Sequence, residues 1–235
     1  MPPLRSGLAT LLAICLPGAA TAAPFTLTLP GVPNGTPMPA KYAFCMRGAD
    51  HHLHPGGDIS PPLAWSGAPA GTQSFVITML DPDVPKGMTA AEANTGIPIS
   101  APRRIFVHWL LADVPATTHA LPEGADSPGQ EAHGKPAIRT PFGLRGTNDF
   151  TFALIEDARH NGEHAGYDGP CPPSIDLKPH GYRITLYALN VKHLKLRPGF
   201  TRDDLTAAMK GHVLARARTI ATYSVLKPSL QKARR

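Results

Sequence analysis

The sequence predicts a β-dominated domain, and three observations lead to this prediction. Short apolar or alternating segments recur along the chain, and clusters of turn residues bound them. Proline and glycine contribute 27 and 22 of the 235 residues, and so much proline argues against long helices because it breaks helix interiors. Spacing typical of an amphipathic helix is clear only near the carboxyl end. Strands followed by one or two helices indicate an all-β or β-dominated domain.

Five segments have the composition and spacing of strands. We expect strands at Phe25–Leu29, Gln73–Leu80, Ile105–Ala112, Phe150–Ile155 and Arg183–Val191. The third segment, IFVHWLLA, is apolar on both faces and is therefore expected in the centre of a sheet. The second is rich in β-branched and aromatic residues, and we expect it to end at the Asp-Pro pair that follows it.

The clearest helical pattern covers residues 202–217, where apolar residues recur at helical spacing. Thr201 is suited to cap the first turn of this helix. The acidic residues Asp203 and Asp204 would complement the helix dipole there.

Two long segments between the strands lack a regular pattern. Residues 84–103 connect two buried strands and could contain one helical turn at Thr89–Ala93, whereas residues 115–149 are rich in glycine, proline and histidine. Long excursions of this kind are often functional. No repeat and no change in composition marks a boundary, so we expect residues 23–235 to form a single domain.

Composition limits the kinds of protein that this chain can be. Hydrophobic residues make up 42% and charged residues 17%, which is enough for a buried core. The formal net charge of +6 favours anionic partners, but no nucleic-acid-binding motif accompanies it. We therefore expect no nucleic-acid partner and no cofactor. No apolar run after the amino terminus is long enough to span a bilayer, so we expect no integral membrane segment.

Residues 1–22 have the pattern of a secretory signal peptide. The positive charge of Arg5 precedes the apolar stretch Leu8–Leu16, and a run of small residues follows. The stretch is too short for a membrane-spanning helix, which needs about 20 residues. A buried amino-terminal helix and lipid attachment at Cys15 are the alternatives. We expect cleavage after residue 22 and a periplasmic or secreted protein.

Two cysteines, Cys45 and Cys171, follow the leader. Disulfides persist in oxidising compartments, and a bond between these two would close a loop of more than a hundred residues. The alternative is a pair of buried free thiols.

Polar residues occur at or inside three of the apolar segments. The segment DPDVP at residues 81–85 follows a buried strand, and its prolines would hold two carboxylates at low entropic cost. His108 lies within the most apolar strand, and His180 and Tyr182 share one face at strand spacing. The glycines and prolines before His180 could leave backbone N–H groups free to face an anion. The simpler interpretations are an aspartate-capped turn and a hydrogen-bonded core histidine.

The order and separation of these segments resemble those of the phosphatidylethanolamine-binding protein family. The similarity is greatest to its bacterial branch, the Raf kinase inhibitor-like proteins. It rests on SPPLxW at residues 60–65, DPDxP at 81–85, HW at 108–109, GPCPP at 169–173 and HxY at 180–182. It extends over about residues 25–228, nearly the whole chain after the leader.

This resemblance implies a large antiparallel sheet with Greek-key connections, packed on a smaller sheet, with a helix or helices at the carboxyl end. It also implies a pocket for a small anionic or phosphorylated ligand. The residues carried over to that pocket are Asp81, Pro85, His108, His180 and Tyr182, with Asp83 in a more structural role. Protonated histidines and a tyrosine hydroxyl can donate to an anion, and an adjacent aspartate favours a ligand that also carries a proton or an amine. A zwitterionic head group meets both conditions.

Three functions are compatible with these residues. The first is an exported module that binds a phosphorylated ligand, or a protein segment presenting one, and could thereby modulate another protein. The alternative is an acid–base hydrolase of phosphoesters or esters that uses Asp81 with His108 or His180. The third is a protein-interaction module that binds no small ligand. Because no nucleophile motif or metal site is evident, we expect binding rather than catalysis.

Two further clusters receive the simpler interpretation. His51, His52 and His54 have a spacing that suits a metal, but no suitable partner follows, so we expect exposed histidines and no metal site. Arg103 and Arg104 could reach a phosphate at the pocket mouth, but we expect them simply to begin a strand in solvent.

Overall fold

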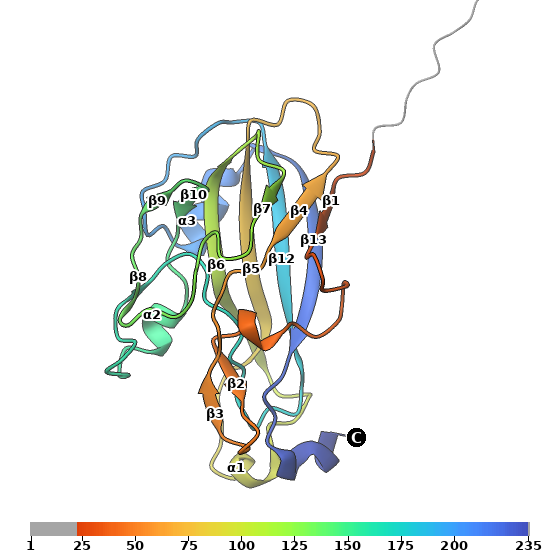
Figure 1. Ribbon diagram of the computed structural model, residues 1–235, viewed down its shortest axis with the longest axis vertical. Helices are drawn as coiled ribbons and strands as arrows, with labels where there is room; N and C mark the ends of the chain where they lie inside the picture. The colour runs from red at the N-terminus through yellow and green to blue at the C-terminus, as the bar shows by residue number, and fades with distance from the viewer. Residues whose placement is uncertain (1–22, 235) are drawn as a thin grey trace, which may run out of the picture.

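A six-stranded antiparallel sheet forms the centre of the molecule (Figure 1). The computed structural model describes residues 23–234. From edge to edge the strands are β13 (Val213–Tyr223), β12 (His180–Leu189), β5 (Ser74–Pro85), β6 (Arg103–Pro115), β10 (Gly143–Arg145) and β9 (Arg139–Thr140). Strands far apart in sequence, such as β5 and β12, are neighbours, as in Greek-key connections.

A smaller three-stranded sheet covers one face of the large one. Its strands are β1 (Thr26–Thr28), β4 (Leu63–Ser66) and β7 (Ala120–Leu121). Their side chains Leu27, Trp65 and Leu121 pack in one apolar cluster with Phe75 and Trp109 of the large sheet. The opposite face packs against α3 (Arg202–Met209) and the segment before it in a second cluster. Both faces of β5 and β6 are therefore buried, and the predicted fold class is confirmed.

The remaining elements are short. Two strand pairs lie outside the sheets: β2 (Cys45–Arg47) with β3 (Leu53–Pro55), and β8 (Gly134–Lys135) with β11 (Glu163–His164). The other helices are α1 (Glu92–Thr95), α2 (Phe150–Ala153) and the 3₁₀ turns Ala40–Tyr42 and Pro228–Arg234. Figure 1 shows the β2–β3 hairpin, α1 and the carboxyl end together, beyond one end of the large sheet.

Four of the five predicted strands are present, as β1, β5, β6 and β12. However, β5 does not end at Asp81 as predicted but continues to Pro85. The ladder shifts register between Asp81 and Val84, and Pro82 lies within this bulge. A bulge tolerates a residue without an N–H, so the proline does not end the strand.

The predicted helix over residues 202–217 is wrong in its second half. Thr201 caps α3 as expected, but the helix ends at Met209 and Gly211 follows with a φ of +80°. From Val213 onward the chain forms β13 along the edge of β12. Its buried residues alternate: Ala217, Thr219, Ala221. Pairing with β12 therefore decides the conformation there, in preference to the helical spacing.

The predicted strand at residues 150–155 is also wrong, because this segment begins with α2. The backbone N–H of Asp149 donates to the Val107 carbonyl at 3.0 Å, and its Oδ2 accepts from the Val107 N–H at 2.9 Å. Asp149 thus occupies both groups that a neighbouring strand would need at this point of β6. Phe150 is buried and Phe152 is 69% exposed, so α2 packs through one side only.

The two long connections are more ordered than the sequence suggests. In the excursion 84–103, Ile97 donates to the Ile175 carbonyl at 2.8 Å and accepts from the Leu177 N–H at 3.1 Å. This contact holds the excursion, including α1, against the loop before β12. The segment 115–149, for which the sequence shows no regular pattern, contains the short strands β7 to β10.

The predicted leader, residues 1–22, lies outside the described residues, and so does Cys15. Within residues 23–234, no helix is long and apolar enough to cross a membrane.

Cys45 and Cys171 form a disulfide, with their Cα atoms 5.0 Å apart. The bond ties β2 to the loop that leads into β12. Two hydrogen bonds support this junction, since the N–H groups of Phe44 and Cys45 donate to the Pro170 carbonyl at 2.9 and 3.3 Å. The interpretation of the two cysteines as a bonded pair is therefore confirmed.

The disulfide spans 126 residues, so it should stabilise the fold mainly by restricting the unfolded chain. We expect the Cys45→Ser/Cys171→Ser double variant to lose about 4–5 kcal/mol of unfolding free energy, measured by urea denaturation. Reductant should destabilise the parent protein and leave the double variant unchanged. Equal stability of parent and variant would contradict this role.

Candidate site: a cavity at the end of the large sheet

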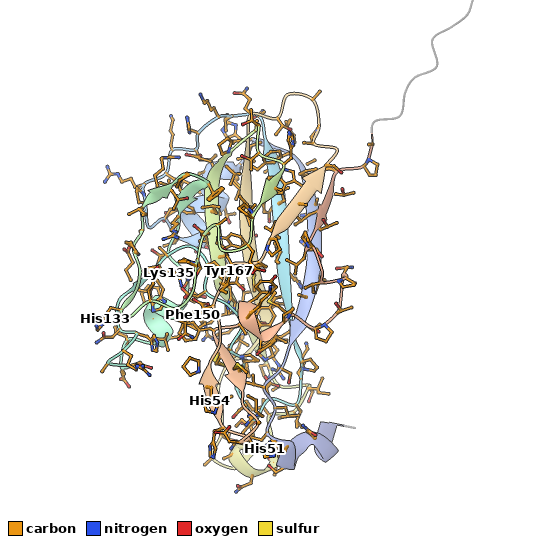
Figure 2. The ribbon with its side chains drawn as sticks, in the orientation of Figure 1. His51, His54, His133, Lys135, Phe150 and Tyr167 are labelled. Carbon is orange, nitrogen blue, oxygen red and sulfur yellow. A yellow bond between two sulfur atoms is a disulfide. The ribbon has the colours of Figure 1, made fainter. Side chains whose placement is uncertain are left out.

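A cavity of about 220 Å³ lies between β5, β6, β12, α2 and the disulfide-linked loop. Its polar lining groups are Asp81, His108 and Tyr182, and all three residues are buried. Its other walls come from Phe44, Val84, Phe106, Phe150, Ala153, Leu154, Cys171, Pro172 and Pro173. Phe150, which is labelled in Figure 2, belongs to α2 and also lines the cavity. The cavity is thus largely apolar, with a few polar groups.

The bulge in β5 brings Asp81 and Val84 to the same side of the sheet. Asp81 is paired with Phe106, and Val84 is paired with Arg104, which precedes Phe106 by two residues in β6. In a regular strand, residues three apart face opposite sides, but the extra residue of the bulge cancels this difference. The Asp83 N–H donates to Asp81 Oδ1 at 2.8 Å and closes the turn within the bulge.

A second irregularity places His108. Leu80 pairs with Val107 and Met79 pairs with Trp109, so His108 has no residue opposite it on β5. This insertion lets His108 line the cavity while the next residue, Trp109, packs in the core beneath the small sheet. Bulges often redirect side chains beside binding sites.

Two hydrogen bonds to Asp168 hold His108. The Asp168 N–H donates to the His108 carbonyl at 3.0 Å, and His108 Nδ1 lies 2.9 Å from the Asp168 carbonyl oxygen. Since a carbonyl only accepts, Nδ1 carries the hydrogen. Burial lowers the pKa of His108 against the opposing effect of Asp81, so the ring is neutral. Its Nε2 is then an acceptor, and residues 23–234 supply it with no partner.

Tyr182 supplies a hydroxyl group to the same cavity. The residue is fully buried, yet its Oη makes no hydrogen bond of normal geometry within the described part of the chain, although the Asp81 carboxylate is close enough to interact with it. Burial and the nearby Asp81 raise the pKa of this phenol well above its usual value, so it stays protonated. The Tyr182 ring packs edge-on against His108, with centroids 5.1 Å apart. The structure therefore offers one unused donor beside two acceptors.

His180 lies behind Asp81 and is absent from the cavity lining. Its Nδ1 is 2.6 Å from Asp81 Oδ2, and its Nε2 is 2.9 Å from Asp176 Oδ2. Burial acts to lower the pKa of His180, but the hydrogen bonds to Asp176 and Asp81 outweigh it and raise the pKa to about 9. The protonated ring therefore donates to both carboxylates and has no hydrogen left for a ligand. It orients Asp81 instead.

Asp176 and Arg103 continue this chain of charges, and neither was predicted from the sequence to be a site residue. Arg103 Nη1 donates to Asp176 Oδ2 at 2.5 Å, and Nη2 donates to Oδ1 at 3.2 Å. The Arg103 side chain is only 11% exposed, so the expectation that it merely begins a strand in solvent is wrong. Arg104 is exposed, and its guanidinium lies over the Phe106 ring at 5.5 Å.

Asp83 and Pro85 lie outside the cavity lining. Asp83 Oδ2 accepts from the Gly181 N–H at 2.8 Å, and its Oδ1 forms an ion pair with Lys178 Nζ at 2.6 Å. Despite the opposing effect of burial, these contacts lower the pKa of Asp83. Pro85 is the buried last residue of β5, paired with Arg103.

Aromatic rings form one continuous wall of the cavity. Phe150 is in contact with Phe44, Phe106 and His108, at centroid distances of 4.7, 5.2 and 5.4 Å. Cys171 continues this wall through the disulfide. The face of an aromatic ring attracts cations, so this wall suits an ammonium group as well as an apolar one.

A buried ion cluster supports the loop beside His108. Lys135 Nζ lies 2.8 Å from Asp58 Oδ2 and 2.6 Å from Asp168 Oδ1. Burial alone would lower the pKa of Lys135, but the two carboxylates raise it. Asp58 also accepts from the Gly169 N–H at 2.7 Å. The N–H groups of Asp168 and Gly169 are therefore already used and are not free to face an anion.

The histidine cluster of the β2–β3 hairpin is separate from the cavity. His51 and His54 are exposed, and Figure 2 shows them away from Phe150. His54 Nε2 is 2.9 Å from both carboxylate oxygens of Asp50. No group of three or more potential metal-ligating side chains occurs in residues 23–234.

These features define a class of two-sheet β proteins with a small, partly aromatic cavity at one end of the larger sheet. A family model described as phosphatidylethanolamine-binding protein matches residues 28–224. The chain belongs to the phosphatidylethanolamine-binding protein family. The resemblance identified from the sequence motifs is thus confirmed.

Known relatives in bacteria support this assignment. A UPF0098 protein of Aquifex aeolicus is 34% identical over 172 residues, which cover 72% of this chain and 75% of the relative. The UPF0098 protein YbcL of Escherichia coli is 29% identical over 208 residues, or 88% of each chain. The crystal structure of E. coli YbcL, described as a member of the mammalian family, superimposes with a TM-score of 0.61 at 26% identity and covers 86% of this chain and 99% of its own. The crystal structure of a family homolog from Chlamydia trachomatis superimposes with a TM-score of 0.59 at 27% identity. The match covers 87% of this chain and 99% of the homolog.

The buried position of His180 predicts a pH dependence of stability. The pKa of His180 is raised from the usual 6.5 to about 9 in the folded protein. Its contribution to the stability of the fold is therefore complete below pH 6.5 and is lost as the pH rises towards 9. At 1.36 kcal/mol per unit, the unfolding free energy should fall by about 3 kcal/mol over this range. Urea denaturation at several pH values measures this change.

The comparison variant is His180→Gln, in which the unfolding free energy should not show this fall between pH 6.5 and pH 9. His193→Gln is the control, because it makes the same replacement at a histidine that is 60% exposed. A parent protein equally stable at pH 6.5 and pH 9 would show that His180 is not held protonated.

Proposed function

We propose that this protein binds a small phosphorylated ligand in the cavity, with a zwitterionic head group of the phosphoethanolamine type as the preferred class. One observation carries this proposal: the Tyr182 hydroxyl is fully buried and makes no hydrogen bond of normal geometry in the described structure, although it borders a cavity. A buried hydroxyl without a partner costs free energy, and a ligand oxygen would remove that cost.

The other two polar groups favour a ligand that can also donate. Asp81 is a carboxylate, and His108 Nε2 is a neutral acceptor, so a ligand with acceptors only would meet Asp81 unfavourably. A phosphate oxygen can accept from Tyr182, while an ammonium group donates to Asp81 or lies against the aromatic wall. A singly protonated phosphate could satisfy the same groups in part. The family name points to the same head group.

The hydrolase alternative gains no support from the lining of the cavity. The lining contains no serine or threonine, and its cysteine is bonded to Cys45. The proposed role is therefore binding. Modulation of another protein that presents such a phosphorylated group would use the same contacts.

We also propose that the protein is exported and acts in the periplasm or outside the cell. The leader pattern of residues 1–22 supports this location, and the Cys45–Cys171 bond is of the kind that persists in oxidising compartments. Expression of the full chain in a bacterium, followed by cell fractionation and amino-terminal sequencing, should give an exported chain that begins at residue 23. An uncleaved chain in the cytoplasm would exclude this proposal.

The binding proposal is tested by titrating residues 23–235 with phosphate and with phosphoethanolamine, while NMR follows the histidine ring signals. We expect saturable shifts of His108 with both, and tighter binding of phosphoethanolamine. An Asp81→Ala/Tyr182→Phe double variant should show no saturable shift. No response of the parent protein at millimolar concentrations would refute the binding proposal.

Two buried tyrosines provide a matched pair of variants. Tyr182→Phe removes a hydroxyl without a partner, so stability should stay the same or rise by up to about 1 kcal/mol, while ligand affinity falls about tenfold. Tyr167→Phe removes a hydroxyl that donates to the Tyr42 carbonyl at 2.6 Å, so it should cost about 1 kcal/mol and leave affinity unchanged. Urea denaturation and NMR titration measure the two effects. The opposite assignment of effects would contradict this account of the cavity.

A further inference from the structure

The cavity presents an electrostatic problem for an anionic ligand. Its only charged lining residue is a carboxylate, Asp81, and no lysine or arginine is among the lining residues. A carboxylate alone would repel a phosphate group, and the low dielectric constant of a buried site would strengthen the repulsion. A positive charge close to Asp81 is therefore needed if the cavity is to accept an anion.

The structure supplies this charge from behind the cavity. His180 is buried between Asp81 and Asp176, and Arg103 forms two hydrogen bonds with Asp176. With His180 protonated, the four groups alternate in sign and their net charge is zero. A nearby ion pair, Asp83 with Lys178, adds no net charge. The Tyr182 ring, which stacks on His180 at 6.4 Å, is neutral.

Three parts of the chain must meet to build this row of charges. Asp81 comes from β5, Arg103 from the first residue of β6, and Asp176 and His180 from the loop before β12 and its first residue. Arg103 Nη1 also donates to the Asp83 carbonyl at 2.7 Å, which fixes the guanidinium against the bulge in β5. The guanidinium is therefore held in one place and does not move freely in solvent.

We infer that Arg103, acting through Asp176 and His180, determines the charge of the ligand that the cavity accepts. Arg103 is a positioning residue, because it does not line the cavity. This inference rests on the proposed function, since it concerns the same cavity. Without the guanidinium, Asp81, His180 and Asp176 carry a net charge of −1 beside the ligand. With it, the site is neutral overall and can accept an anion.

The test compares two small probes of opposite charge, inorganic phosphate and ethanolamine, at pH 7 and low ionic strength. Arg103→Gln should weaken phosphate binding about fivefold and leave ethanolamine binding equal or tighter, as a charge on the order of 10 Å from the ligand predicts. The double variant Arg103→Gln/Asp176→Asn removes one charge of each sign, so phosphate affinity should return to within about twofold of the parent. A merely structural role of Arg103 would weaken both probes, and the double variant would not recover.

Arg139→Gln is the matched control, because Arg139 forms a similar ion pair with the buried Asp113 in another part of the sheet, at 2.8 Å. It should change neither affinity. A measurement on the parent protein needs no variant: ¹⁵N NMR at pH 7.5 should show that both ring nitrogens of His180 carry hydrogen.

The outcomes separate this inference from the binding proposal. If the parent binds neither phosphate nor phosphoethanolamine, the proposed function fails, and the inference fails with it. If the parent binds phosphate and Arg103→Gln binds it equally well, only the inference fails. A singly protonated His180 ring at pH 7.5 would also overturn it, because the row of charges would no longer be balanced.

Discussion

One buried histidine, His180, holds the Asp81 carboxylate in place at the base of a largely apolar cavity. His180 donates to Asp81 and to Asp176 at the same time, so each carboxylate has a partner within 3 Å. Isolated buried charges cost many kcal/mol, whereas a hydrogen-bonded row of alternating charges can be accommodated. Because Arg103 ends this row near the surface, the ends of two strands and the loop before a third must keep fixed relative positions.

Irregularities in the ladder give the cavity its polar groups. The bulge after Asp81 places this carboxylate and Val84 on one wall, and the insertion at His108 frees that histidine from strand pairing. The backbone groups released by these irregularities are used again nearby, since Asp83 bonds Asp81 and Asp168 bonds His108. A regular pair of strands would have buried the same side chains on opposite faces.

Much of the fold could be predicted from local patterns, and the errors have a common cause. Strands that are apolar on both faces were identified correctly, because such a pattern needs cover on both sides. The segments 150–155 and 210–217 were assigned the wrong conformation because their apolar spacing suits both helix and strand, and tertiary partners decided between them. Asp149 prevents residues 150–155 from pairing with β6 as a strand. Pairing with the edge of β12 makes the chain from Val213 onward a strand.

The sequence by itself determined the fold class, the family and the positions of Asp81, His108 and Tyr182 along the chain. The family resemblance also predicted that these three side chains share a pocket. Only the tertiary structure decided that His180 lies behind them, bonded to two carboxylates. The reason is physical: sequence spacing tells which face of a strand a side chain occupies, but burial and hydrogen bonding depend on what the neighbouring strands and loops bring to that face. Arg103 shows the same limit, because its partner is 73 residues away.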